Sequence, residues 1–175
     1  MHPAQQQVTT QARRFNVVKA GRRFGKTKLC EELLLCTDND QNGALAGFPV
    51  GYFAPTYKML AETWRQISDI VAPVIASKNE QEKRIESIGG GVVEFWSLDE
   101  PNTIRGRKYK RIVVDECEYV PNFKDAWQQV LRATLTDYRG DAWFLSTPKF
   151  GSSFFKDLAK LDDQAVREIR RRAEA

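Results

Sequence analysis

The tripeptide Gly25-Lys26-Thr27 constrains the fold of this 175-residue chain more than any other feature. It lies between residues 15–20, an apolar run that predicts a buried strand, and residues 26–37, a pattern that predicts a helix. At such a turn the backbone N–H groups and the positive end of the helix dipole face a bound anion. Lys26 would reach the β- and γ-phosphates of ATP, and the Thr27 hydroxyl would ligate Mg²⁺. An exposed turn with a helix cap is the alternative for the tripeptide alone.

The first position of this phosphate loop departs from the usual pattern, G-x-x-x-x-G-K-[ST]. Ala20 stands where the first glycine is expected, and the glycine follows one residue later, at Gly21. An arginine, Arg22, comes next. The loop is therefore a variant that combines a small residue at its first position with an arginine close behind it.

Two adjacent carboxylates follow a second apolar run. Residues 110–116 (KRIVVDE) predict a strand buried on both faces that ends in Asp115 and Glu116. Ligands of open α/β sheets bind at the carboxyl ends of the strands, where these acids lie. Asp115 would hold Mg²⁺ through its water shell, and Glu116 would deprotonate the water that attacks the γ-phosphate. Glu118 is a weaker candidate for the base, and surface acids after a strand are the alternative.

A third strand is predicted over residues 141–145, and it is followed by Ser146, Thr147 and Pro148. Hydroxyl groups at that edge of a sheet can sense the γ-phosphate and pass its loss to neighbouring segments. An ordinary strand-ending turn explains the same residues equally well.

Residues 104–111 carry five basic side chains and no acid: Arg105, Arg107, Lys108, Lys110 and Arg111. An arginine from this segment could complete a neighbouring subunit's ATP site, where a guanidinium is worth roughly 10³-fold or more in rate. A patch that binds DNA phosphates and a merely solvated loop are the other interpretations.

Strands alternate with helices through the rest of the chain. The predicted elements are a strand over 50–54, a helix over 57–74 with its apolar stripe, including Trp64, in the core, a β-hairpin over 84–88 and 92–96, and a helix over 123–136. We expect the hairpin to be an excursion before the strand that ends at Asp115. The alternation predicts an α/β fold of three layers around a mostly parallel central sheet. Residues 1–175 would form one domain, with a helix from residue 152 and residues 156–175 leading out of the domain.

Composition excludes some classes of site. Cys30, Cys36 and Cys117 lack the spacing of a zinc site, and His2 is the only histidine, so buried reduced thiols in a cytosolic protein are expected. The net charge of +4 is compatible with a polyanionic partner without identifying one. We find no signal peptide and no apolar run long enough to cross a membrane.

The order of these motifs resembles the large terminase subunit, the ATPase of tailed-phage DNA-packaging motors. The resemblance extends from about Pro3 to about Phe155 and includes six short motifs: Pro3-Ala4-Gln5, Gly21-Arg22-Arg23-Phe24-Gly25-Lys26-Thr27, Ala54-Pro55-Thr56-Tyr57, Ile104-Arg105-Gly106-Arg107, Val113-Val114-Asp115-Glu116 and Ser146-Thr147-Pro148. A small first residue and an arginine in the phosphate loop are usual in that family. The resemblance implies a P-loop NTPase fold of the RecA-like type.

The resemblance also implies roles for individual residues. Gln5 matches a glutamine that contacts adenine, although Gln6 and Gln7 leave its register open. Arg22 matches the arginine taken to contact the γ-phosphate, Gly21, Gly25, Lys26 and Thr27 match the phosphate and magnesium loop, and Asp115 and Glu116 match the metal-binding acid and the base. Ser146, Thr147 and Pro148 match the motif that couples hydrolysis to movement. Arg105 matches a finger that acts across a subunit boundary, with Arg107 as its rival.

Partners and location follow from the same resemblance. It implies double-stranded DNA, a portal and procapsid, a small terminase subunit, a homo-oligomeric ring, and the cytoplasm of the infected or lysogenic bacterial host. Full large terminases carry a second, nuclease domain after the coupling motif, for which the residues after Pro148 are too few, so we expect no DNA cleavage by this chain.

Three other functions stay open at this stage. One is a helicase-like DNA-dependent ATPase outside packaging, which shares the adjacent Asp and Glu. Another is a small P-loop kinase, although a glutamate base beside the magnesium ligand favours hydrolysis over transfer. The last is a catalytically silent assembly module.

Overall fold

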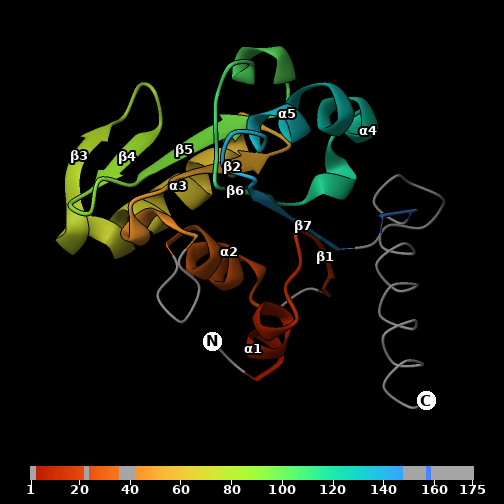
Figure 1. Cartoon of the computed structure of the whole chain (residues 1–175), viewed down its shortest axis with the longest axis horizontal. Helices are drawn as coiled ribbons and strands as arrows, with labels where there is room; N and C mark the ends of the chain where they lie inside the picture. The colour runs from red at the N-terminus through yellow and green to blue at the C-terminus, as the bar shows by residue number, and fades with distance from the viewer. Residues whose placement is uncertain (1–2, 22–23, 36–41, 148–156, 159–175) are drawn as a thin grey trace.

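A seven-stranded sheet forms the centre of the molecule in a computed structural model that describes residues 3–21, 24–35, 42–147 and 157–158 (Figure 1). Its strand order is β1-β7-β6-β2-β5-β4-β3. The first five strands in this order are mutually parallel, and β4 and β3 extend one edge in antiparallel fashion. The strands are β1 (Phe15–Lys19), β2 (Pro49–Ala54), β3 (Ile75–Asn79), β4 (Arg84–Ser87), β5 (Val92–Ser97), β6 (Arg111–Val114) and β7 (Asp141–Ser146).

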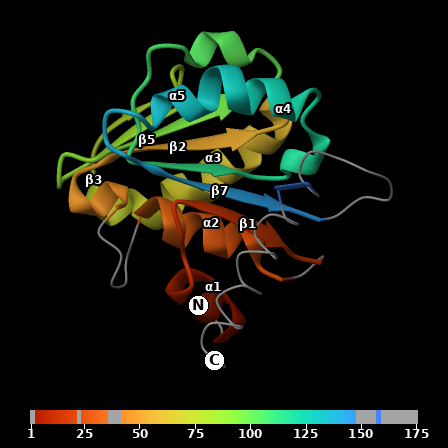
Figure 2. The same ribbon diagram turned by 45° about the vertical axis from the view of Figure 1, so that its right-hand side comes forward.

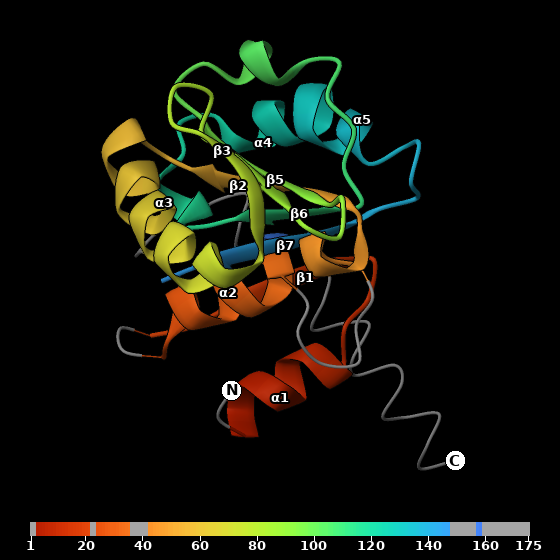
Figure 3. The ribbon, with the colours of Figure 1, turned by 90° about the vertical axis from the view of Figure 1, so that its left-hand side faces the viewer.

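Helices cover both faces of this sheet. Figure 3 shows α2 (Lys26–Leu35) and α3 (Tyr57–Val71) on one side of the strands, with α4 (Phe123–Ala126) and α5 (Arg132–Thr134) on the other. The remaining helical segments are α1 (Pro3–Thr10), η1 (Ala44–Ala46), η2 (Ala72–Val74), η3 (Pro101–Ile104), η4 (Cys117–Tyr119) and the π-helical η5 (Trp127–Leu131). The predicted three-layer α/β fold with a mostly parallel sheet is therefore confirmed.

The sheet is buried on both faces because its central strands carry apolar residues at successive positions. In β6 all four residues are buried, with Val113 in the cluster on the α2 and α3 side and Ile112 and Val114 in the cluster on the α4 side. In a strand successive side chains point to opposite faces, so a continuous apolar run fills both layers. The predicted buried strand before Asp115 is confirmed.

Helix α3 shows how the sequence pattern sets one of the covering layers. The Thr56 hydroxyl caps it by accepting a hydrogen bond from the Met59 amide, as expected for an N-cap threonine. The predicted stripe of Leu60, Trp64, Ile67 and Val71 is buried in the core. The helix ends at Val71 rather than at residue 74, because Pro73 has no N–H to continue the hydrogen-bond pattern.

The predicted hairpin forms, but its second strand belongs to the main sheet. Strands β4 and β5 pair in antiparallel register from Arg84 with Glu94 to Glu86 with Val92. β5 also pairs in parallel with β2 along its whole length, so the interpretation as an excursion is wrong for β5. In the turn, a Cβ on Gly91 would lie 2.0 Å from the Ala44 carbonyl oxygen, so only glycine lets η1 approach this closely.

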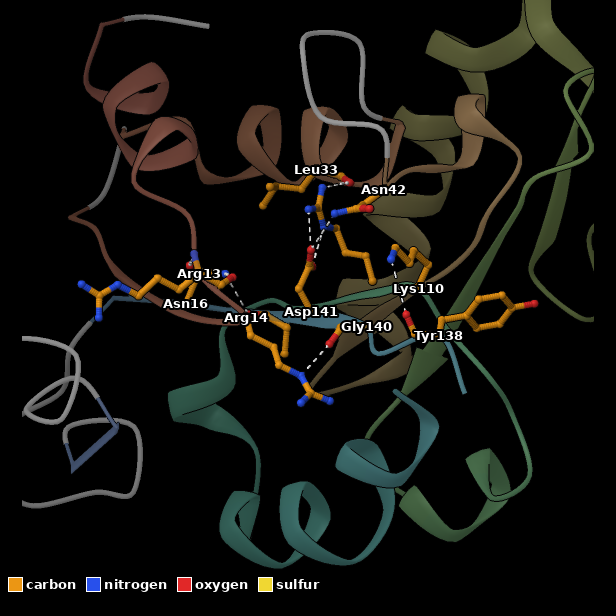
Figure 4. Close-up of polar contacts among 11 residues, drawn as sticks. Arg13, Arg14, Asn16, Leu33, Asn42, Lys110, Tyr138, Gly140 and Asp141 are labelled. Carbon is orange, nitrogen blue, oxygen red and sulfur yellow. Dashed lines mark hydrogen bonds and ion pairs between the residues drawn. The ribbon is translucent and has the colours of Figure 1, made fainter. Parts of the chain in front are cut away.

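A buried ion pair joins β6 and β7 at the ends of these strands opposite Glu116 and Thr147. Arg111, which is 1% exposed, donates from Nη2 to Asp141 Oδ2 and from Nε to Asp141 Oδ1, both at 2.6 Å. Figure 4 shows Leu33 and Asn42 on the α2 side of Asp141, where the Leu33 carbonyl accepts from Arg111 Nη1 and Asn42 Nδ2 donates to Asp141. Two paired charges with further hydrogen bonds meet the condition for burial.

Several predictions concern residues at the margins of the structure. The helix predicted from residue 152 and the segment 156–175 lie outside the described residues, except for Asp157 and Leu158. Leu158 packs partly buried against the cluster on the α4 side. Within the described residues, Cys30 and Cys117 are buried free thiols, and no helix has the length and apolar character needed to span a bilayer.

Candidate active site

Three adjacent strands bring the predicted motifs to one edge of the sheet. β7 lies between β1 and β6, so the phosphate loop after β1, residues Ser146 and Thr147 at the end of β7, and the acids after β6 stand next to one another. All three strands are parallel, and their carboxyl ends therefore meet where ligands of open α/β sheets bind. Figure 1 shows the ends of β1 and β7 side by side.

Lys26 contacts both of the other motifs. Its Nζ lies 3.1 Å from Glu116 Oε1 and donates to Thr147 Oγ1 at 2.7 Å. The Lys26 side chain is 12% exposed and that of Glu116 is 20% exposed, so this ion pair is largely shielded from solvent. A cation at the first residue of α2 and a carboxylate at the end of β6 are thus within direct reach of each other.

Glu116 is held by the end of β7 as well. The Ser146 hydroxyl donates to Glu116 Oε2 at 3.2 Å, and the Thr147 amide donates to the same oxygen at 3.3 Å. Ser146 Oγ in turn accepts from the Glu118 amide at 3.3 Å. Glu116 itself adopts a left-handed backbone conformation with φ 46° and ψ 40°, which non-glycine residues seldom take outside functional sites.

Asp115 is buried beside the exposed part of the site. Tyr52 Oη donates to Asp115 Oδ2 at 3.1 Å, and the Glu116 amide donates to Oδ1 at 2.9 Å. Burial, and next the charge of Glu116, raise the pKa of the Asp115 carboxyl above its ordinary value, which these two hydrogen bonds oppose. The carboxylate is therefore kept in an environment that a divalent cation would relieve.

Sequence reasoning missed Tyr52 as a site residue. Its ring is 1% exposed in β2, and its hydroxyl lies 3.0 Å from Thr63 Oγ1 of α3 besides contacting Asp115. A buried tyrosine hydroxyl needs a hydrogen-bond partner, which is the one signal in the sequence that could have marked it. Burial, and next the charge of Asp115, raise the pKa of the Tyr52 hydroxyl, so it stays protonated as a donor.

The phosphate loop is anchored at its two ends. Ala20 is 4% exposed, and its amide donates to the Ser146 carbonyl at 3.2 Å, which ties the start of the loop to β7. Gly25 has φ +81°, the left-handed region in which glycine is favoured. Gly21 is exposed, and Thr27 lies partly buried in the first turn of α2. Arg22 lies outside the described residues, as does Pro148.

Gln5 of α1 packs against this loop. Its side chain is buried, and Nε2 donates to the carbonyl oxygens of Gly25 at 3.0 Å and Phe24 at 3.3 Å. Gln6 and Gln7 are exposed, so Gln5 is the glutamine of this run that lies at the phosphate loop. A Cβ on Gly25 would come within 2.8 Å of Gln5 Nε2, which gives this glycine a second reason besides its φ.

Arg105 is not part of this cluster. It follows η3 and is exposed, and its Nε donates to Asn102 Oδ1 at 3.0 Å. Figure 2 shows the green segment around η3 on the side of the sheet away from α2, the helix that follows the phosphate loop. The structure therefore separates Arg105 from the other predicted site residues of the same chain.

Relatives in sequence agree with the motifs. Residues 17–164 match the model of a family described as terminase large subunit, T4likevirus-type, N-terminal. The chain is also 30% identical over 108 residues to the large terminase subunit of Escherichia phage T5, a match that covers 60% of this chain and 24% of that protein. The chain thus spans about a quarter of the length of this relative.

Solved structures share the fold. The ATPase domain of the Thermus phage P74-26 large terminase superposes with a TM-score of 0.71 at 19% identity, over 90% of this chain and 68% of that one. The large terminase of another thermophilic bacteriophage, in complex with ADP, gives a TM-score of 0.61 at 18% identity, over 83% of this chain and 37% of that one. The parallel sheet and its phosphate loop are of the P-loop NTPase type. With a family model that matches residues 17–164, the chain belongs to the large terminase subunits, as their N-terminal ATPase domain.

Proposed function

We propose that this chain is a Mg²⁺-dependent ATPase that couples ATP hydrolysis to the movement of double-stranded DNA into a procapsid. The contact between Lys26 and Glu116 carries the proposal, because it unites a phosphate-binding cation and a base in one site. The thermophilic-phage terminase in complex with ADP adds support from a protein of the same fold.

Each site residue has a proposed task. Lys26 binds the β- and γ-phosphates, and backbone amides of the loop with Gly21 and Gly25 surround them. Glu116 orients and deprotonates the attacking water. Ser146 and Thr147 sense the γ-phosphate, because both contact Glu116 and Thr147 also contacts Lys26. Arg22 is the proposed γ-phosphate ligand of the loop, and Gln5 lies where it could contact the nucleotide base.

The chemistry of two residues fits Mg²⁺. This ion takes oxygen ligands and is usually held by one or two protein groups together with water and substrate phosphates. Thr27 offers a hydroxyl and Asp115 a carboxylate, and no cluster of three His, Cys, Asp or Glu exists in the described part of the chain. When bound with ATP, the ion would neutralise charge that develops on the phosphates.

Arg105 is proposed to act on a neighbouring copy. A guanidinium placed at the γ-phosphate stabilises the negative charge of the transition state. Since Arg105 is exposed and lies across the sheet from α2, its own phosphate loop is the less accessible target (Figure 2). Such a finger requires a homo-oligomeric ring in which each subunit completes the next subunit's site.

The wider setting is proposed from the family. Residues 1–175 form one ATPase domain, with residues 156–175 leading out of it. The assembled motor engages a portal, a procapsid and a small terminase subunit in the cytoplasm of the bacterial host. Double-stranded DNA is the polyanion to which the net charge of +4 is suited.

Phosphate release from ATP tests the proposal. The parent chain should hydrolyse ATP with Mg²⁺, faster with double-stranded DNA, and lose activity in EDTA. Lys26→Ala should abolish nucleotide binding, whereas Lys28→Ala, which removes a lysine 53% exposed on the same helix, should leave it intact. Hydrolysis by Lys26→Ala at the parent rate would contradict the proposed site.

A further inference from the structure

The loop of residues 98–109, which we call the finger loop, joins β5 to β6 and carries both Arg105 and Arg107. We propose that Arg107 is a positioning residue that fixes the finger loop on its own subunit, so that Arg105 is presented to the site of a neighbouring copy. This inference rests on the proposed function of Arg105 and assigns a separate task to Arg107.

Arg107 is engaged with its own chain on two sides. Its Nη1 lies 3.0 Å from Glu94 Oε1, and its guanidinium carbon lies 5.1 Å from the centroid of the Trp96 ring. Glu94 is 8% exposed, so the pair is shielded at the carboxylate. A planar guanidinium both stacks on an aromatic face and pairs with a carboxylate, which an ammonium does less well.

The two partners of Arg107 are themselves fixed by Tyr109. The Tyr109 hydroxyl donates a short hydrogen bond to Glu94 and accepts one from Trp96 Nε1 at 2.8 Å. Tyr109 is 1% exposed, and its amide donates to the Thr134 carbonyl at 2.8 Å. Arg107 therefore binds a rigid surface of β5, not another mobile side chain.

The other side of Arg105 is fixed by packing. Ile104 is fully buried in the cluster on the α4 side, and its carbonyl accepts from the Arg107 amide at 3.2 Å. Between them, Gly106 has φ +86° and open space around its Cβ position, so the chain can turn outward at this point. Arg105 is thus held between Ile104 and Arg107 while its own side chain stays exposed.

This asymmetry decides between the two arginines. Arg107 already faces a carboxylate that neutralises it, whereas Arg105 forms no ion pair with any described residue and bonds only the neutral Asn102. A catalytic guanidinium must be free to meet phosphate oxygens and yet be held in place beforehand, since misplacement by 1 Å can cost roughly 10²-fold in rate. Arg105 meets the first requirement and Arg107 supplies the second.

Mixed assemblies test the assignment. Arg107→Ala should lower kcat by roughly 10- to 100-fold at an unchanged KM for ATP. Mixing it with Glu116→Gln subunits, which have an inactive site but an intact finger loop, should restore activity above the average of the two. Arg107→Lys should fall between Ala and the parent, and Arg132→Ala, an exposed arginine of α5, should match the parent.

Failures of the two proposals are distinguishable. A normal kcat for Arg105→Ala would overturn the finger itself. An inactive Arg105→Ala together with a normal Arg107→Ala, or no rescue on mixing, would overturn only the positioning role. So would an Arg107→Ala variant that binds double-stranded DNA more weakly but hydrolyses normally when saturated with it.

Amide hydrogen exchange gives a second test that does not require assembly. Arg107→Ala should speed exchange of residues 103–109 by about tenfold or more and leave β5 unchanged. Unchanged exchange of the finger loop would overturn the proposal. Faster exchange throughout the chain would also overturn it, because Arg107 would then stabilise the whole fold and not the loop.

Discussion

Lys26 and Glu116 form an ion pair in which 3.1 Å separates Nζ from Oε1. The residue proposed to bind the phosphates and the residue proposed to activate water therefore hold each other directly. The phosphates of ATP carry more negative charge than one carboxylate and would compete with Glu116 for Lys26. Glu116 would then remain hydrogen-bonded to Ser146 and to the Thr147 amide.

This competition predicts that Glu116→Gln binds nucleotide more tightly than the parent. The substitution removes the competing charge and leaves Lys26 with the Thr147 hydroxyl. We expect the Kd for ADP to fall by roughly 3- to 10-fold, as for a partly exposed ion pair, while hydrolysis falls by about 10²- to 10⁴-fold. Titration with a fluorescent ADP analogue measures the first effect. Glu118→Gln is the matched control, and weaker ADP binding by Glu116→Gln would contradict the competition.

Tyr52→Phe should weaken the site at Asp115. The pKa of Asp115 is raised mainly by burial and then by Glu116, and the Tyr52 hydroxyl opposes this rise, so its loss should favour the protonated acid. The Mg²⁺ concentration for half-maximal hydrolysis should rise severalfold, and the free energy of unfolding should fall by about 1 kcal/mol. Thr63→Val removes the other contact of the same hydroxyl and should leave the Mg²⁺ dependence unchanged. An equal shift in both variants would assign the effect to general loosening of α3.

Gly91→Ala should destabilise the fold through a steric conflict. The new Cβ would lie 2.0 Å from the Ala44 oxygen, a backbone atom that cannot rotate away. We expect a loss of about 1–3 kcal/mol in the free energy of unfolding, measured in urea. Gly21→Ala is the control, because its Cβ would meet no atom within 4 Å, and equal losses in the two variants would refute the steric explanation.

Glu80 gives the fold a pH dependence on the acid side. Hydrogen bonds from Lys78, then Lys83, lower the pKa of Glu80 from 4.5 to about 2, and Trp64 Nε1 also donates to it. Because the folded state favours the charged form, the stabilisation is present above pH 4.5 and is lost as the pH falls through about 2. Glu80→Gln should therefore lower Tm at pH 7, by an amount that narrows below pH 4.5. A constant difference, or the same profile for Glu82→Gln, would exclude Glu80 as its source.

The fold was predictable where apolar runs are long. β1, β2, β6 and β7 follow from such runs, and α3 follows from its stripe at helical spacing. Two elements escaped for physical reasons. α1 (PAQQQVTT) has no apolar stripe, and β3 (IASKN) is almost wholly exposed and owes its strand conformation to pairing with β4. The helix expected over 123–136 forms over 123–134, with a π-helical segment that no local pattern indicates.

The site was predictable as a set of motifs but not as a set of contacts. Order along the chain and the parallel sheet suffice to place Lys26, Glu116 and Ser146 at one edge. The partner that each side chain selects depends on rotamers and on the left-handed turn at Glu116, which local sequence does not encode. Tyr52 was invisible for a related reason, since an apolar strand pattern makes no distinction between a tyrosine that only packs and one that donates to Asp115.

The buried pair of Arg111 and Asp141 has a consequence at the far end of the same two strands. β6 and β7 are joined by this pair at one end and by the bonds from Ser146 and Thr147 to Glu116 at the other. Sliding one strand along the other would separate both sets at once, and separating Arg111 from Asp141 alone would cost about 3–5 kcal/mol. The distance between the base and Thr147 should thus stay constant through a catalytic cycle. Displacement on nucleotide exchange then falls to Lys26 and its loop, which move against a fixed two-stranded frame.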